Sequence, residues 1–149
     1  MGGSNGGLTV GAVMTQRPEL FKAVICQVPL LDMYRYHKFL IAARWTGDLG
    51  DPDKADEFEF IRKWSPYHNV KVGVEYPNVL FTTANKDTRV ASFHAWKMAA
   101  LLQSTNKDNI VLMRTEMDAG HGPGKPIKKI IEGQAYILAF LAWELGLKV

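Results

Sequence analysis

The sequence predicts an α/β fold built on a parallel sheet. Three runs of apolar residues, at 23–28, 78–84 and 109–115, have the length of buried strands and are flanked by proline or polar residues. Segments between and after them carry apolar residues at helical spacing. Strands that alternate with amphipathic helices are typical of βαβ units, whose crossovers are right-handed. With 149 residues, 47% of them hydrophobic, the chain has the size and composition of one domain, residues 1–149.

The first half of the chain is expected to open with a helix and to end in an irregular segment. Near-helical spacing of apolar residues predicts a short buried helix over 6–16, before the first strand. Residues 32–53 are rich in aromatic and turn-forming residues, and they predict a short helix followed by a long ordered loop. Asp53 is expected to cap a further helix that runs to about Trp64.

The second half is expected to hold two strands and two longer helices. A well-patterned helix over 90–103 follows the second strand, and a glycine-rich loop over 118–125 follows the third. The last helix is predicted over 126–145, with Pro126 near its first position. Its expected buried stripe consists of Ile127, Ile130, Ile131, Ile137, Leu138 and Leu141.

Composition argues against several classes of protein. The formal net charge is only +3 and the basic residues are scattered, which argues against a nucleic-acid surface. The single cysteine, Cys26, excludes an internal disulfide framework and fits a reducing compartment, so we expect a cytoplasmic protein. No apolar stretch approaches the roughly 20 residues that span a bilayer, and the first residues do not predict a secretory signal. The four histidines are widely spaced, and neither a metal site nor a cofactor is expected.

The first residues match a nucleophile elbow. Gly2-Gly3-Ser4-Asn5-Gly6 fits the pattern G-x-S-x-G, in which serine occupies a tight strand-to-helix turn and small neighbours let the two backbones approach closely. By composition alone the same run could be a flexible linker. The buried helix predicted directly after it favours the elbow. The preceding strand that such a turn requires is expected to be missing.

Asp87 and His121 are the candidate partners of Ser4. A serine nucleophile needs a base, and the base needs an acid that orients it. Asp87 follows the second strand and His121 follows the third, in the chain order of α/β-hydrolases. Both therefore lie at the carboxyl ends of strands, where sites of open parallel sheets form.

The other histidines and one further aspartate are weaker candidates. His94 lies on the apolar face of a predicted helix, which favours a core role. His37 and His68, in aromatic-rich irregular segments, are also expected to be structural. Asp118 is only three residues from His121 in one loop, which is poor geometry for orienting the ring, so a turn or capping role is expected.

Four sequence blocks resemble the prolyl oligopeptidase family of serine peptidases. The run at 2–7 is similar to the family's nucleophile segment, and 87–103 resembles its aspartate-loop block. Residues 119–126 resemble its histidine-loop block, and 27–45 is similar to a further segment. The resemblance covers essentially the whole chain, with the blocks in the family's order. It implies the C-terminal part of an α/β-hydrolase domain, and a triad of Ser4, Asp87 and His121.

The resemblance also implies substrate-binding residues. Asn5 would supply an oxyanion N–H. Trp45 matches a tryptophan that stacks on the substrate proline ring, and a plain core role is its alternative. Leu30 and Val90 match apolar residues of the same proline pocket. Arg89 matches an arginine that binds the peptide carbonyl before the proline, and a surface salt bridge is its alternative.

The chain departs from the family pattern at several points. Leu49 stands where the family has a tyrosine in the proline pocket, and Lys86 stands where it commonly has aspartate. The first strands of the sheet, the β-propeller and a tyrosine that donates to the oxyanion are expected to be absent. The strand at 23–28 would then have an unpaired apolar edge, prone to association.

Two functions follow from these observations. The first is a serine-type oligopeptidase that hydrolyses short proline-containing peptides, its partners being those peptides and the absent half of the hydrolase domain with its propeller. The second is a truncated, inactive remnant that acts only as an association partner. No nucleic-acid or membrane partner is expected.

Overall fold

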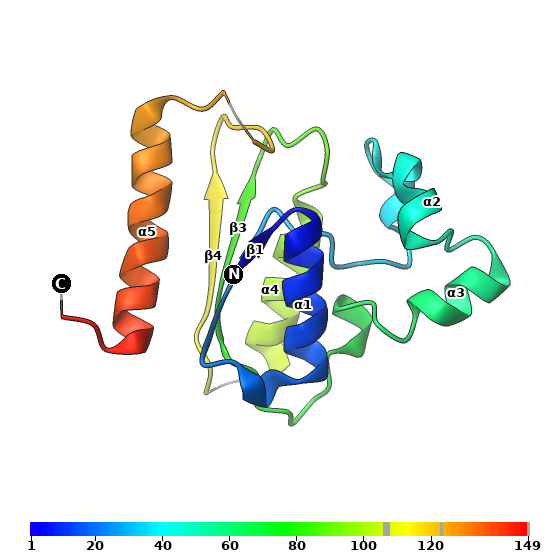
Figure 1. Ribbon diagram of the computed structural model, residues 1–149, viewed down its shortest axis with the longest axis horizontal. Coiled ribbons are helices and arrows are strands. Elements are labelled where there is room, and N and C mark those ends of the chain that lie inside the picture. Colours follow the sequence, from blue (N-terminus) through cyan, green and yellow to red (C-terminus); the bar gives the residue numbers. More distant parts are fainter. Residues whose placement is uncertain (106–107, 123, 149) are drawn as a thin grey trace.

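The computed structural model describes residues 1–105, 108–122 and 124–148. Four parallel strands form one sheet in the order β1-β2-β3-β4 (Figure 1). The strands are β1 (Gly2–Gly3), β2 (Ala23–Gln27), β3 (Asn78–Ala84) and β4 (Val111–Glu116). Strands that follow one another in the chain are therefore neighbours in the sheet, and all run the same way, as βαβ units require. The predicted α/β class is confirmed.

Helices cover both faces of the sheet. In Figure 1, α1 (Asn5–Gln16) and α4 (Phe93–Thr105) lie on one face, and α5 (Ile127–Leu145) lies on the other. Two short helices, α2 (Thr46–Leu49) and α3 (Ala55–Ile61), extend beyond α1 on the side away from α5. Among the helices that the structure describes, none combines the length and apolar character needed to cross a bilayer. The remaining turns of helix are 3₁₀ segments at Pro18–Leu20, Tyr36–Lys38, Ala42–Trp45 and Tyr67–Asn69.

The strand side chains alternate between two apolar layers, as a sheet covered on both faces demands. Val24 and Phe81 point into the layer shared with α1 and α4, whereas Ile25 and Leu80 pack against Ile137 of α5. A third cluster joins α1 to the segment between β2 and α3. Its buried members are Leu8, Leu30, Met33, Tyr36, Ala42, Ile61 and Val90.

The strand before Ser4 was expected to be missing, and that expectation is wrong. Gly2 and Gly3 form β1 and pair in parallel with Cys26 and Gln27 of β2. Two residues are enough to hold the start of the elbow in the sheet. They also pair the end of β2 that was expected to be an open apolar edge.

Two helices start at residues other than those predicted. In each case the carboxylate of a nearby aspartate, Asp87 or Asp53, binds other groups. The helix predicted from Val90 begins at Phe93, because Asp87 accepts the backbone N–H of Arg89 and of Val90 and holds them in a turn. Asp53 does not cap α3, which begins at Ala55 without a side-chain cap. The segment 32–53, predicted as one short helix and a loop, contains two 3₁₀ turns and α2.

The stripe predicted to be buried on α5 is wrong at four of its six positions. Ile137 is buried and Leu141 is partly buried. The other four members are between 43% and 71% exposed: Ile127, Ile130, Ile131 and Leu138. Phe140, which the prediction left out, is buried instead. The helix carries apolar residues on more than one face, and periodicity alone does not show which face meets the sheet.

A buried carboxylate joins the segment after β2 to α4. Asp32 is fully buried and accepts hydrogen bonds from Arg35 Nη2 at 2.7 Å and from Lys97 Nζ, on α4, at 2.5 Å. Burial acts to raise the pKa of Asp32, but the hydrogen bonds from Lys97 and Arg35 outweigh it and hold the pKa below its usual range. The ionised carboxylate is therefore stable in the interior because it is paired.

His94 completes this attachment as a neutral acceptor, which confirms the core role expected for it. Its Nδ1 accepts the backbone N–H groups of Leu31 at 3.3 Å and Asp32 at 3.0 Å. Since Nδ1 accepts, the proton of the neutral ring is on Nε2. Burial lowers the pKa of His94 to about 4, with Lys97 and Arg35 acting in the same direction and Asp32 opposing them.

We expect the stability of the fold to decrease in mild acid because of His94. Between about pH 6.5 and about pH 4, the unfolded chain takes up a proton on this residue that the folded chain excludes. The free energy of unfolding should thus be unaffected by His94 above neutral pH, and its loss should approach about 3 kcal/mol near pH 4. Urea unfolding near pH 7 and near pH 4.5 measures the difference in the free energy of unfolding between the two conditions. His94→Asn keeps an acceptor but does not titrate, and an equal acid loss in both proteins would contradict the prediction.

A second prediction concerns the contact between α1 and β2. A Cβ atom at Gly7 would lie 2.8 Å from the Gln27 carbonyl oxygen and 2.8 Å from Pro29 Cβ, whereas a Cβ at Gly6 would meet nothing within 4 Å. Gly7→Ala should therefore lower the free energy of unfolding by about 1–3 kcal/mol. Gly6→Ala should leave it unchanged or raise it by up to about 1 kcal/mol. Chemical denaturation of the two variants side by side makes the comparison, and similar midpoints would be inconsistent with the close approach.

Candidate active site

Ser4 lies in a strained turn between β1 and α1. Its φ of 57° and ψ of −120° are a conformation that residues with a side chain rarely adopt. Two backbone hydrogen bonds fix the turn: the Ser4 N–H donates to the Gln27 carbonyl at 2.9 Å, and the Leu8 N–H donates to the Ser4 carbonyl at 3.1 Å. The geometry is that of a nucleophile elbow, with the hydroxyl presented at the end of the sheet.

Three side chains that are far apart in the sequence form a hydrogen-bonded chain. His121 Nε2 lies 2.9 Å from Ser4 Oγ, and His121 Nδ1 lies 2.6 Å from Asp87 Oδ2. Ser4 follows the carboxyl end of β1, Asp87 follows that of β3, and His121 follows that of β4. The sequence prediction named these three residues, and the structure brings all three together.

The hydrogen bonds at Asp87 determine which nitrogen of His121 is protonated. Asp87 Oδ1 accepts the N–H of Arg89 at 2.8 Å and of Val90 at 2.9 Å. Burial would raise the pKa of Asp87, but the hydrogen bonds from His121, Val90 and Arg89 outweigh it and lower the pKa. An ionised carboxylate only accepts, so His121 Nδ1 donates to it. His121 Nε2 is then free to accept the hydroxyl proton of Ser4.

The loops that carry Asp87 and His121 are tied to each other outside this chain of hydrogen bonds. Lys86 Nζ pairs with Asp118 at 2.7 Å, and the Lys86 N–H donates to the Ala119 carbonyl at 3.1 Å. The Asp118 N–H donates to Asn85 Oδ1 at 2.7 Å. Asp118, with a φ of 54°, therefore has the turn role that the sequence suggested. Lys86, which departs from the family pattern, here helps to hold the two loops together.

A small cavity of about 170 Å³ opens beside Ser4. Trp45, Leu30 and Arg89, three of the residues predicted for substrate binding, line it. Val90 does not line it; this residue is buried in the apolar cluster behind, next to Leu30. The full lining is Ser4, Asn5, Leu30, Trp45, Asp48, Leu49 and Arg89.

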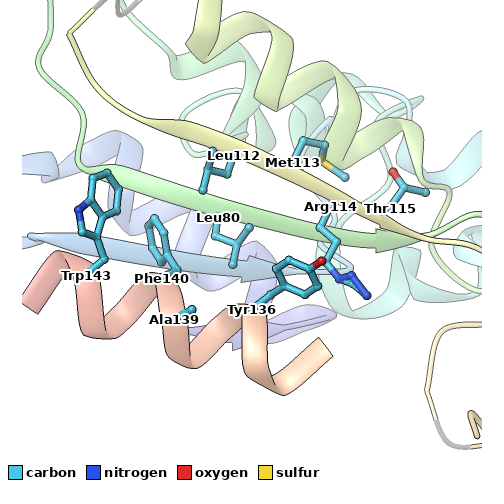
Figure 2. Close-up of a pocket in the computed structure, with 9 residues that line it drawn as sticks. All are labelled: Leu80, Leu112, Met113, Arg114, Thr115, Tyr136, Ala139, Phe140 and Trp143. Atoms are coloured by element: carbon cyan, nitrogen blue, oxygen red, sulfur yellow. The ribbon is translucent and has the colours of Figure 1, made fainter. Parts of the chain in front are cut away.

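Asp48 is the lining residue that the sequence analysis did not single out. It lies in α2, one turn of helix after Trp45, so both can face the same cavity. A helical prediction limited to these few residues would have found it. The larger groove of about 630 Å³ in Figure 2 lies between β4 and α5 and contains none of the residues predicted for the site.

Asn5 is the first residue of α1. The N–H groups of the first helical turn have no carbonyl four residues earlier within the helix. The N–H of Asn5 therefore adjoins Ser4 at the positive end of the helix, where a developing negative charge is stabilised. The position suits an oxyanion donor.

Within the described ranges, one set of side chains comes close enough to share a metal ion. The ligand atoms of His37, Asp51 and Asp53 lie within 4.8 Å of one another. Asp53 already contacts His37 Nε2 at 3.0 Å and Lys38 Nζ at 3.1 Å. The Asp53 carboxylate is thus already in contact with two side chains of the protein. His68, the other histidine expected to be structural, stacks on Tyr34 and shares a 2.8 Å hydrogen bond with Ser65 Oγ.

Comparison with known proteins agrees with the geometry. The profile of the Prolyl oligopeptidase family matches residues 1–148. The prolyl endopeptidase of Elizabethkingia miricola is 43% identical over an aligned length of 149 residues, and the match covers 99% of this chain and 21% of that protein. Prolyl oligopeptidase A of Galerina marginata is 40% identical, over 98% of this chain and 20% of that protein.

Solved structures give the same result. A structure from a study of two prolyl endopeptidases superposes with a TM-score of 0.95 at 44% identity, covering 99% of this chain and 22% of that one. A post-proline cleaving enzyme from Rickettsia typhi superposes with a TM-score of 0.93 at 38% identity, covering 99% of this chain and 21% of that one. The chain thus spans about a fifth of the relatives that it matches. It belongs to the prolyl oligopeptidase family and has the fold of the C-terminal α/β-hydrolase part of those enzymes.

Proposed function

We propose that this chain carries the catalytic residues of a serine peptidase that cleaves short peptides after proline. The observation that carries the proposal is the hydrogen-bonded chain Ser4–His121–Asp87. Ser4 Oγ attacks the carbonyl carbon of the scissile peptide bond while His121 Nε2 removes its proton. Asp87 holds the ring and stabilises the imidazolium that forms. His121 then gives the proton to the leaving amine, and water attacks the acyl-enzyme by the same route.

The Asn5 N–H is the oxyanion donor in this proposal. The negative charge on the carbonyl oxygen develops next to Ser4, at the first turn of α1, where the helix dipole also favours it. The resemblance to the family implies a second donor from a tyrosine that lies outside the four matching sequence blocks. Removal of one oxyanion donor costs roughly 100- to 1,000-fold in turnover. The chain by itself is therefore proposed to react slowly with peptides, and to reach full activity with the remaining hydrolase strands and propeller.

The cavity beside Ser4 is the proposed proline pocket. Trp45 offers a flat aromatic surface for the pyrrolidine ring, and Leu30 supplies an apolar wall, with Val90 as packing behind it. Arg89 also lines this cavity and is proposed to donate to the peptide carbonyl that precedes the proline. Leu49 replaces a tyrosine of the family pattern and leaves this pocket without a hydroxyl donor at that point. A reducing compartment such as the cytoplasm fits the single buried thiol of Cys26.

Labelling with a fluorophosphonate probe tests whether Ser4 is activated. We expect the purified chain to form a covalent adduct at Ser4, because an oriented base is already within hydrogen-bond distance of the hydroxyl. Ser4→Ala and heat-denatured protein should not react. Asp87→Asn should react at least about 1,000-fold more slowly, since the wrong tautomer of His121 would be favoured. A folded chain that is not labelled would support the alternative of an inactive association partner.

The specificity of the pocket is tested separately at Trp45. Trp45→Ala should raise KM for a proline-containing peptide by about tenfold or more, as expected for loss of an aromatic contact of about 1.4 kcal/mol. Hydrolysis of a small ester that does not reach the pocket should change little. Steady-state kinetics on both substrates gives the comparison, with Trp96→Ala as a control at an exposed tryptophan on α4. Equal losses on the two substrates would argue against ring stacking.

A further inference from the structure

His37 is a buried histidine that the proposed mechanism does not use. Its side chain is only 9% exposed, and neither ring nitrogen makes a hydrogen bond to a described residue. Both nitrogens are out of reach of solvent, so a group on the outside of the fold does not supply the missing partner. A polar group that is buried without a partner costs free energy, and a bound ion is one of the few arrangements that remove this cost.

Two carboxylates lie next to this ring. His37 Nε2 is 3.0 Å from Asp53 Oδ2, and the ligand atoms of His37, Asp51 and Asp53 are all within 4.8 Å of one another. The 3.0 Å contact is short enough for a hydrogen bond, but it is not in line with the ring N–H and makes none. With the ring proton on Nδ1, the lone pair of Nε2 would face a carboxylate oxygen. Two acceptors at this distance repel each other unless a cation lies between them.

The carboxylates are held in position by groups outside the cluster. The Asp51 N–H donates to Glu57 Oε2 at 2.5 Å, which fixes the start of the loop that carries both aspartates. Lys38 Nζ contacts Asp53 Oδ1 at 3.1 Å, so the other oxygen of the same carboxylate is the one beside the ring. Outer partners of this kind orient ligand side chains in metal sites.

The donor atoms identify the class of ion. One imidazole nitrogen and two carboxylate oxygens suit a divalent transition metal such as Zn²⁺, whereas Mg²⁺ and Ca²⁺ prefer oxygen alone. Zn²⁺ bonds of about 2.0–2.2 Å set two ligand atoms about 3.4 Å apart in a tetrahedron. The contact between His37 and Asp53 is close to this spacing. Asp53 is 62% exposed, so its side chain has room to rotate and admit the ion.

We propose that His37, Asp51 and Asp53 bind one Zn²⁺ ion, with water in the fourth position. The ion joins the 3₁₀ turn Tyr36–Lys38 to the loop that follows α2. Because α2 lies between the histidine and the two aspartates, no short spacing motif marks the set, and the sequence did not predict a metal site.

The ion has a consequence for the segment that it encloses. Trp45 and Leu49, which line the cavity beside Ser4, lie in the chain between the two attachments of the ion. Zn²⁺ therefore closes a loop around this part of the cavity wall and restricts its motion. Binding of the ion does not depend on the proposed peptidase function.

Titration of the metal-free chain with Zn²⁺, in competition with a chromophoric chelator, tests the site. One equivalent should bind with a dissociation constant of about 10 μM or lower. Asp51→Asn and Asp53→Asn keep the shape of the side chains and should each weaken binding by about tenfold or more. Asp56→Asn, the same change at an exposed aspartate in the first turn of α3, is the matched control and should bind as the unchanged chain does. No binding, equal affinity in all four proteins, or tighter binding of Ca²⁺ overturns the proposal.

Thermal unfolding tests whether the ion joins the two segments in the folded chain. Saturating Zn²⁺ should raise the unfolding temperature of the unchanged chain and of Asp56→Asn, because a ligand that binds only the folded state stabilises it. The unfolding temperature of Asp53→Asn should change little. An equal rise in all three proteins would contradict a site at these residues.

Histidine NMR distinguishes this site from zinc bound at the candidate active site. Of the four histidines, only His37 should shift its ring nitrogen resonances when one equivalent of Zn²⁺ is added. His121→Ala should leave the affinity for Zn²⁺ unchanged. Loss of binding in this variant, or a shift confined to His121, would place the ion at the active site and overturn the proposal. Labelling of Ser4 by the fluorophosphonate probe is a separate measurement, so failure of either proposal is recognised without the other.

Discussion

The backbone of α1 passes so close to the end of β2 that a side chain at Gly7 would collide with the Gln27 carbonyl. Much of the structure depends on this approach. It brings the Ser4 N–H to Gln27, holds the serine at a positive φ, and lets the thiol of Cys26 reach the Gly7 carbonyl at 3.3 Å. A helix set farther from the strand would relax the turn. The serine hydroxyl would then no longer stand at the end of the sheet, within hydrogen-bond distance of His121.

The remaining site residues are positioned by the loops at the same end of the sheet, and those loops are attached to α4. The Asp32–Lys97 pair and the two amides on His94 fix the segment after β2, which carries Leu30. Asp87 lies just before α4 and orders its own turn through Arg89 and Val90. Buried polar groups therefore have a structural part here, because Asp32 and His94 each join two segments that are distant in the sequence.

The sequence predicted the sheet well, because its strands are buried on both faces and read as short continuous apolar runs. The bounds of β3 match the prediction at both ends. Ser4, Asp87 and His121 could be proposed from the sequence because each carries a local signal: a small-residue turn, or a polar residue just past a strand. Asp48 was not assigned, because its segment was predicted as a loop and not as α2. Which face of α5 meets the sheet was also missed, since spacing along one helix does not contain that information.

The cross-links between the loops of Asp87 and His121 have a consequence for catalysis. Lys86 and Asp118 form an ion pair, and two backbone hydrogen bonds run beside it, yet none of these contacts involves Ser4. The loops that carry Asp87 and His121 are thus joined directly to each other, as well as through the hydrogen bond between those two side chains. In the mechanism that we propose, His121 and Asp87 are already oriented when Ser4 Oγ attacks the carbonyl carbon, so proton transfer from the hydroxyl needs no rearrangement of either loop.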